Sequence, residues 1–216
     1  MKSPAPRAPD LGYAGGVSGP FWPYVVALAK RGAAVAAAAA APAAAPAPPP
    51  DLSATYAAEA VLLAKVAPYD SSFAARAGDG VEIGILTRAD SIGSNAAGAA
   101  LQAELGRVGS IGGLPHEEVL LPYSDAPALV TACRLRRVAI LVVTPSFGPE
   151  LDKVRAALDG MDILTVAAAP ADVSRGLVLG FEVVDGKPRM LLNRAEALRH
   201  NVKFRSDVVR LMKIVR

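Results

Sequence analysis

Apolar blocks alternate with amphipathic stretches along the chain after residue 80. Four β-type runs, at 81–87, 117–123, 138–143 and 162–168, are rich in aliphatic side chains. Runs that are apolar on both faces, such as VAILVV, are typical of a parallel sheet that helices cover on both sides. We therefore interpret the four runs as strands of one largely buried sheet.

The segments between these runs repeat apolar residues at helical spacing. Leu101, Leu105 and Val108 place a helix at about 95–108, and another helix is predicted at about 53–66, before Pro68. Two more helices are expected around 129–137 and 151–161. This alternation predicts an α/β fold: a three-layer, mostly parallel sheet with helices on both faces and right-handed crossovers.

The pattern changes after Leu177. Two β-type runs flank Asp185 and Gly186, a pair that favours a two-residue hairpin turn. A short helix is expected after Asn193, because asparagine suits an N-cap. One stripe at helical spacing then predicts a terminal helix through Phe204, Val208, Leu211, Met212 and Val215. An antiparallel C-terminal hairpin and this last helix complete the predicted fold.

The first fifty residues have a different composition. Lys30 and Arg31 precede an Ala/Val run, which an alanine-rich and proline-rich stretch follows. A charged region, a short apolar region and an Ala-x-Ala exit are the order of a secretory signal peptide. The closely spaced prolines favour an extended tether. We therefore predict two parts, a signal-peptide-like, Ala/Pro-rich tether at 1–50 and a folded domain at 51–216, and we expect export to the periplasm.

Composition fits one folded unit, and charge changes the picture only locally. The chain has 216 residues, is 52% hydrophobic and carries a formal net charge of +3. That excess lies in residues 1–50, so net basicity is no argument for nucleic acid, and no nucleic-acid partner is expected. Residues 187–216, however, hold nine Lys or Arg against Glu196 and Asp207. This run is either a solvated face or a docking face for anionic lipid or an acidic protein.

Metal and nucleotide chemistry find little support in the sequence. Cys133 is the single cysteine, and His116 and His200 have no metal-ligand spacing. The segment GSNAAG at 93–98 lacks both the dinucleotide-binding fingerprint and the P-loop lysine. We expect no metal and no cofactor, and we interpret GSNAAG as a helix start and Cys133 as a small buried side chain.

A series of short motifs runs through the C-terminal third. An LTV strand at 164–166 precedes Arg175-Gly176, the Asp185-Gly186 turn, Asn193 with Ala197, and Ser206 with residues 208–212. In order and spacing this series resembles the YfiR family of exported bacterial proteins. With less specific motifs the resemblance extends over about residues 54–215.

The resemblance implies a non-enzymatic periplasmic regulator that belongs to cyclic-di-GMP signalling. It implies repression or modulation of an inner-membrane signalling protein, a diguanylate cyclase or a sensor kinase, through contact with that protein's periplasmic domain. It also implies a homodimer. It carries over no catalytic residue, only the family-motif positions Arg175, Gly176, Asp185, Gly186, Asn193 and Ser206.

The stretch AILVVTPSFGPEL at 139–151 places Ser146 directly after a strand, where a catalytic serine sits in many hydrolases. Such an elbow needs glycine two residues before and two after the serine, because the turn is crowded. Gly148 is present, but Thr144 takes the first position. We therefore favour Ser146 as the cap of the helix that begins near Pro149.

The same loop is a candidate binding site. For a strand order 2-1-3-4, the loops after strands one and three border the crevice where α/β sheets bind ligands. Thr87, Arg88 and Asp90 then lie near Thr144 and Ser146, and amides at two helix starts favour a small anionic ligand. The alternative is an unoccupied polar rim.

Three functions remain open at this stage. The first is the protein-binding regulator of the YfiR type. The second is a small serine hydrolase that uses Ser146, and the third is a stand-alone periplasmic receptor for a small molecule.

Overall fold

A seven-stranded sheet forms the centre of the domain in the computed structural model, which describes residues 52–216. The strands lie in the order β2-β1-β3-β4-β5-β6-β7. Their bounds are β1 Val81–Arg88, β2 His116–Tyr123, β3 Ile140–Val143, β4 Leu164–Ala167, β5 Leu179–Val184, β6 Lys187–Asn193 and β7 Met212–Val215. Neighbours pair in parallel except β5 and β6, which form the antiparallel hairpin.

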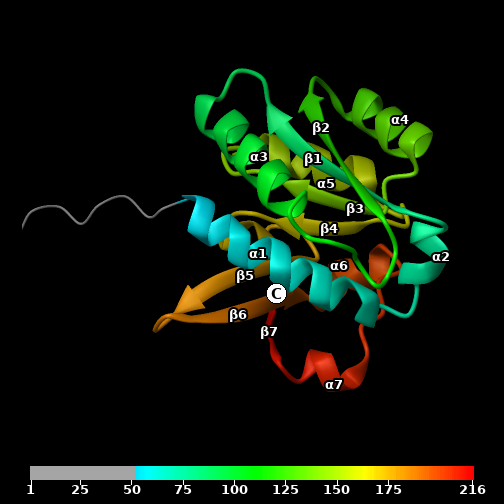
Figure 1. Ribbon diagram of the computed structural model, residues 1–216. Coiled ribbons are helices and arrows are strands. Elements are labelled where there is room, and N and C mark those ends of the chain that lie inside the picture. The colour runs from blue at the N-terminus through cyan, green and yellow to red at the C-terminus, as the bar shows by residue number, and fades with distance from the viewer. Residues whose placement is uncertain (1–51) are drawn as a thin grey trace, which may run out of the picture. The chain divides into compact units, whose positions relative to one another are not determined.

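Helices cover the sheet on both faces (Figure 1). Their bounds are α1 Leu52–Val66, α2 Phe73–Ala77, α3 Ile92–Leu105, α4 Ala126–Arg136, α5 Glu150–Leu158, α6 Arg194–Arg199 and α7 Ser206–Val209. Two short 3-10 helices, η1 Ala67–Tyr69 and η2 Pro170–Val173, lie in loops. The three-layer α/β architecture with a mostly parallel sheet is therefore confirmed.

Two hydrophobic cores result, one on each face of the sheet. On one face, α1, α2 and α3 pack side chains such as Tyr56, Leu63 and Leu101 against Ile83 and Ile85 of β1. On the other face, α4 and α5 pack against the alternate side chains of the same strands, with Phe147 and Leu151 at the centre. β1, β3 and β4 are mostly apolar because both of their faces are buried, whereas the edge strand β2 is mostly half-exposed and begins with polar residues.

The C-terminal hairpin has the expected turn. Val184 pairs with Lys187, so Asp185 and Gly186 alone form the loop, and both have positive φ, 52° and 72°. This backbone matches the right-handed twist of the two strands. Asn193 caps α6, as predicted, because its Oδ1 accepts a hydrogen bond from the Glu196 amide at 3.2 Å.

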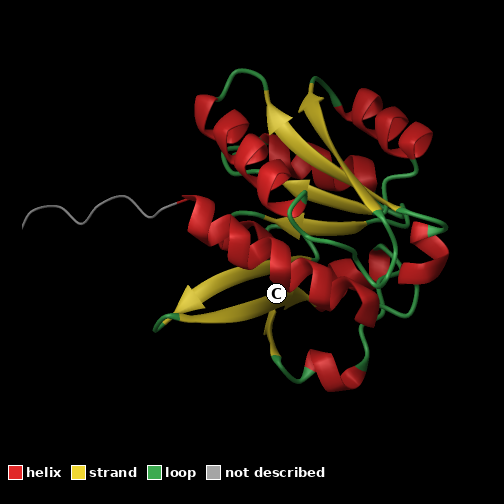
Figure 2. Cartoon of the chain, viewed as in Figure 1, coloured by secondary structure: helices red, strands yellow, loops and turns green. Residues whose placement is uncertain are grey.

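The predicted terminal helix is wrong. Only Ser206–Val209 is helical, and the chain then forms β7, which pairs in parallel with β6 from Met212 beside Met190 to Val215 beside Asn193. Figures 1 and 2, drawn from the same side, show this strand near β6 at the margin of the sheet. This pairing gives hydrogen-bond partners to the amides and carbonyls of β6 that face away from β5. The spacing of apolar residues along the chain does not reveal such a contact.

The predicted tether and signal-peptide-like segment at 1–50 lies outside the described residues. Within 52–216, no helix combines the length and the apolar character that crossing a bilayer requires.

Candidate functional site

The loops that follow β1 and β3 meet at the carboxyl edge of the sheet. The Arg88 guanidinium donates to the Ser146 carbonyl oxygen at 3.2 Å, and it binds Asp90 through both carboxylate oxygens at 3.0 and 2.6 Å. This pairing lowers the pKa of the exposed Asp90 carboxyl. Arg88, Asp90 and Ser146 of the predicted ligand site therefore lie together.

Thr87 and Thr144 face the interior instead. Thr144 is fully buried, and its hydroxyl donates to the Leu86 carbonyl at 2.8 Å. The Ser94 hydroxyl lies 2.6 Å from Thr144 Oγ1 and accepts from the Arg88 amide at 2.8 Å. These bonds join the start of α3 to the ends of β1 and β3, so Thr144 and Ser94 fix the two loops from the interior. Whether the rim above them binds an anion stays a prediction.

Ser146 does not cap a helix, so that prediction is wrong. It is exposed, it has a φ of 82°, and α5 begins after Pro149 without a side-chain cap. The φ of 82° instead turns the Ser146 carbonyl toward Arg88.

Neither histidine can form a triad with Ser146 in this fold. His116 begins β2, which runs parallel to β1 and, through it, to β3, so His116 and Ser146 lie at opposite edges of the sheet. His200 is buried and hydrogen-bonds the Met161 carbonyl at 3.1 Å. Met161 precedes β4, so His200 also lies at the sheet edge opposite to Ser146. Burial lowers the pKa of His200. The hydrolase hypothesis therefore loses its general base among the residues that the structure describes.

The family-motif residues act as structural parts of the fold. Gly176 has a φ of 113° and ends the turn after η2, as predicted. Arg175 pairs with Asp172 at 3.2 Å and donates to the Gly148 carbonyl at 2.5 Å, which ties η2 to the loop after β3. Asn193 also donates to the Val173 carbonyl at 3.0 Å, and Ser206 begins α7.

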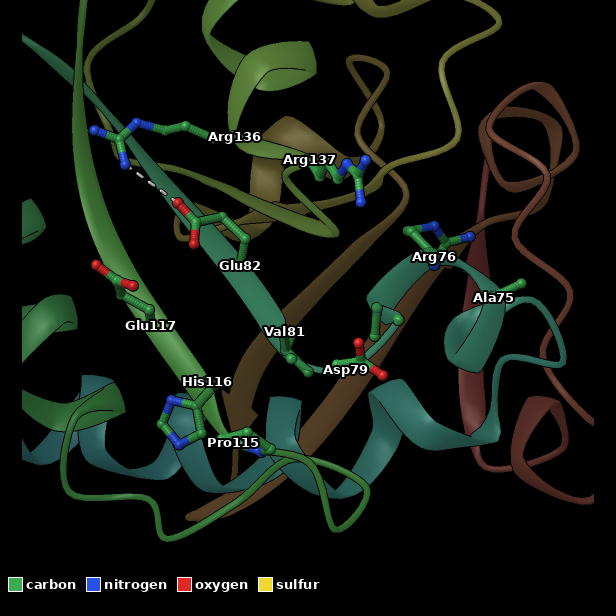
Figure 3. A pocket seen from close by; sticks show the side chains of 13 residues that line it. Ala75, Arg76, Asp79, Val81, Glu82, Pro115, His116, Glu117, Arg136 and Arg137 are labelled. Carbon is green, nitrogen blue, oxygen red and sulfur yellow. Dashed lines mark hydrogen bonds and ion pairs between the residues drawn. The ribbon is translucent and has the colours of Figure 1, made fainter.

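A cavity of mixed charge lies at the amino ends of β1 and β2 (Figure 3). It has a volume of about 540 Å³. Glu82 and Glu117 are register partners on the two strands, and Arg136 donates to Glu82 at 3.4 Å. Both acidic and basic side chains line it, so it offers no single charge to a ligand.

The residues from α6 to the C-terminus form a surface of consistent charge. Two adjoining cavities of about 780 and 430 Å³ share Arg194 and Leu198 in their linings. Four cations line them without a side-chain hydrogen bond or ion pair to any described residue: Arg194, Lys203, Arg210 and Arg216. Leu198 and Ile214 line the same cavities and are 74% and 43% exposed, and Leu211, which follows Arg210 in the chain, is 70% exposed. We call these seven residues the basic face.

The sequence predicted the positive charge of the basic face but not its exposed apolar side chains. Leu211 was assigned to a buried helical stripe, and the change to strand β7 turns it outward. The run of nine Lys or Arg was the only signal in the sequence.

Cys133 is a small buried side chain, as predicted. It belongs to α4 and faces the core, and this burial raises the pKa of its thiol to about 11. Within residues 52–216, no three His, Cys, Asp or Glu side chains are grouped to hold a metal ion.

Comparison with solved structures identifies the fold. The ABC domain from Streptococcus pneumonia in complex with L-Trp is similar, with a TM-score of 0.54 and 14% identity over 75% of this chain. A conserved domain protein from Vibrio cholerae is also similar, with a TM-score of 0.51 and 10% identity over 74% of this chain. The alignments span 60% of each of these chains, and identities this low show a shared fold alone.

A search of the curated proteins found no match. The family comparison, in contrast, covers nearly the whole described domain. The model of YfiR/HmsC-like proteins matches residues 56–213, which include the hairpin turn, the Asn193 cap and strand β7 up to Lys213. The chain belongs to the YfiR/HmsC-like family.

Proposed function

We propose that this protein is a periplasmic regulator that represses or modulates an inner-membrane signalling protein, a diguanylate cyclase or a sensor kinase, by direct contact. Membership of the YfiR/HmsC-like family, whose character is regulatory, supports this proposal. The positions of Ser146 and the two histidines, which separate a nucleophile from any base, also favour binding over catalysis.

The basic face carries the proposal. Arginine and lysine side chains on a monomer surface normally find acidic neighbours or stay scattered, whereas here four cations without a described partner line the same two cavities as the exposed Leu198 and Ile214. Apolar residues ringed by charge are typical of a protein-binding surface. The matching partner is an acidic segment of the signalling protein's periplasmic domain, with apolar side chains that cover Leu198 and Ile214.

Strand β7 adds a second means of contact. It is the last strand of the sheet, and only its β6 side is paired within the described chain. An edge strand accepts an additional strand from a partner. Lys213 on β7 pairs with Glu182 at 3.4 Å, whereas Arg216, directly after β7, has no side-chain partner in the described chain and stays available to an acidic segment. Binding there holds the signalling protein in its inactive population.

Charge reversal tests the proposal against a matched control. The chain is produced in cells together with an inner-membrane diguanylate cyclase or sensor kinase of the same organism, and cyclic-di-GMP or kinase output is measured. The triple variant Arg194→Glu, Arg210→Glu, Arg216→Glu is expected to lose repression at least tenfold, because like charges then face each other. The control, Arg134→Glu with Arg137→Glu, reverses two exposed, unpaired arginines at the far end of α4 and should repress normally.

Two results contradict the proposal. One is an output that does not depend on the wild-type chain. The other is recovery of the mature wild-type protein from the cytosol rather than the periplasm after cell fractionation.

A further inference from the structure

A single acidic side chain, Glu59, lines an apolar cavity between α1 and the C-terminal hairpin. Thr55, Ala58, Glu59 and Leu62 follow helical spacing on one side of α1 and form one wall of this cavity. The other walls come from the loop after β4 and from the hairpin, through Ala168, Pro170, Phe181, Glu182, Val183 and Pro188. The cavity has a volume of about 310 Å³, enough for a small organic molecule.

Glu59 differs from every other buried acid of the described chain. It is 9% exposed and has no hydrogen bond or ion pair with a described residue. The other four buried acids each have an arginine partner: Asp70 with Arg76, Glu104 with Arg107, Asp172 with Arg175, and Glu196 with Arg155. Burial without a partner disfavours the ionised carboxyl and raises the pKa of Glu59 to about 8.

The Glu59 carboxyl keeps some exposure at its oxygens. No fully shielded side-chain oxygen or nitrogen in the described chain lacks a hydrogen-bond partner. Because the Glu59 carboxyl has no such partner, its oxygens are not fully shielded, and Glu59 is a lining residue of the cavity. A buried acceptor without a donor is costly, so a ligand that supplies a donor gains the full benefit of pairing it.

The charges around the cavity select the kind of ligand. Two acids, Glu59 and Glu182, line it, and no Lys, Arg or His does. Glu182 already pairs with Lys213 at 3.4 Å and Arg189 at 3.5 Å, which leaves Glu59 as the open site. Apart from Thr55, the remaining lining is apolar.

We propose that this cavity binds a small organic ammonium ion with an apolar body. The ammonium group donates to the Glu59 carboxylate, and the apolar body fills the space between Leu62, Phe181 and Val183. This site is separate from the basic face and goes beyond the proposed regulatory contact, because it needs no protein partner.

Binding is coupled to the release of a proton. The free carboxyl of Glu59 is largely neutral at pH 7, and an ammonium ion favours its ionised form. Tyr56 on α1 and Glu182 on β5 are the titratable groups beside it, and the loop after β4 contributes none. The affinity is therefore expected to rise about tenfold for each pH unit between pH 6 and pH 8, and then to level off.

Hexylamine is the probe, and hexanol is its neutral counterpart. Calorimetric titration of the full chain at pH 6, 7 and 8 is expected to show hexylamine binding that strengthens with pH, and at least tenfold weaker binding of hexanol. Glu59→Gln keeps the side-chain volume and should weaken hexylamine binding at pH 8 at least tenfold. Glu182→Gln, the matched control on the same cavity, should change it less than threefold because that carboxylate is already paired.

The outcomes separate this proposal from the regulatory one. Absence of hexylamine binding at pH 8, equal binding by the Glu59→Gln variant, or equal affinity for hexanol would each overturn it. Circular dichroism of the variant excludes misfolding as the cause of lost binding. None of these measurements involves the basic face, so the regulatory contact can fail or hold independently.

Discussion

Gly176 shows how one motif residue sets the local structure. Its φ of 113° is a backbone conformation that side chains rarely adopt. An added Cβ would lie 2.1 Å from Cδ of Arg155. Arg155 cannot move away freely, because it holds the buried Glu196 carboxylate at 2.9 Å. The glycine of the Arg-Gly step therefore allows the chain to pass beneath this ion pair.

Substitution at this position should be severe. Gly176→Ala is expected to lower the free energy of unfolding by roughly 2–4 kcal/mol, through backbone strain and displacement of Arg155. Urea denaturation measures the loss. Gly93→Ala in the first turn of α3, where a Cβ meets nothing within 4 Å, should be neutral or stabilising by up to about 1 kcal/mol. Equal effects at both positions would contradict this account.

At the scale of elements, long apolar runs were predictable and the short edge strand was not. The sequence indicated β1, β3 and β4 because strands buried on both faces need continuous apolar residues, and it indicated the half-exposed β2 through a shorter aliphatic run. Strand β7 has four residues, and only Met212 is fully buried. Its conformation depends on pairing with β6, a contact distant in sequence, whereas the spacing from Phe204 to Val215 also satisfies a helix. The spacing of apolar residues alone therefore predicted a helix where the chain forms a strand.

Two neighbouring substitutions distinguish the strand from the helix. The predicted terminal helix would bury both Leu211 and Met212 on its apolar stripe. In the strand, Met212 is 7% exposed and Leu211 is 70% exposed. Met212→Ala should cost about 2 kcal/mol of unfolding free energy, and Leu211→Ala less than about 0.5 kcal/mol. Similar losses of unfolding free energy for the two variants, measured by chemical denaturation, would favour the terminal helix and contradict strand β7.

At the scale of the whole molecule, the sequence predicted where positive charge is concentrated, but it did not predict the cavities. The basic run at 187–216 was visible, while the apolar side chains beside it became exposed only through the fold. Glu59 sits three residues after Tyr56 and four before Leu63, both buried, so its place on the apolar stripe was a signal in retrospect. The hairpin that encloses it comes from more than a hundred residues away.

The unfolding free energy of the whole domain should depend on pH through the ionisation of Glu59. Its pKa of about 8 in the folded chain exceeds the ordinary value of 4.5, so the folded state holds the proton more tightly than the unfolded state. Stability is then highest below pH 4.5 as far as this group is concerned, and it falls as the pH rises toward 8. The slope is at most about 1.4 kcal/mol per pH unit.

Comparison of the wild type with Glu59→Gln isolates this effect. His200 acts in the opposite sense, because its lowered pKa removes stability as the pH falls below about 6.5, and it does so equally in both proteins. The difference in unfolding free energy between variant and wild type should therefore grow from pH 5 to pH 8 and stay constant above. Urea denaturation at intervals of one pH unit measures it. A difference that does not change with pH would mean that Glu59 is solvated or paired in solution, and the open carboxyl in the cavity would have to be given up.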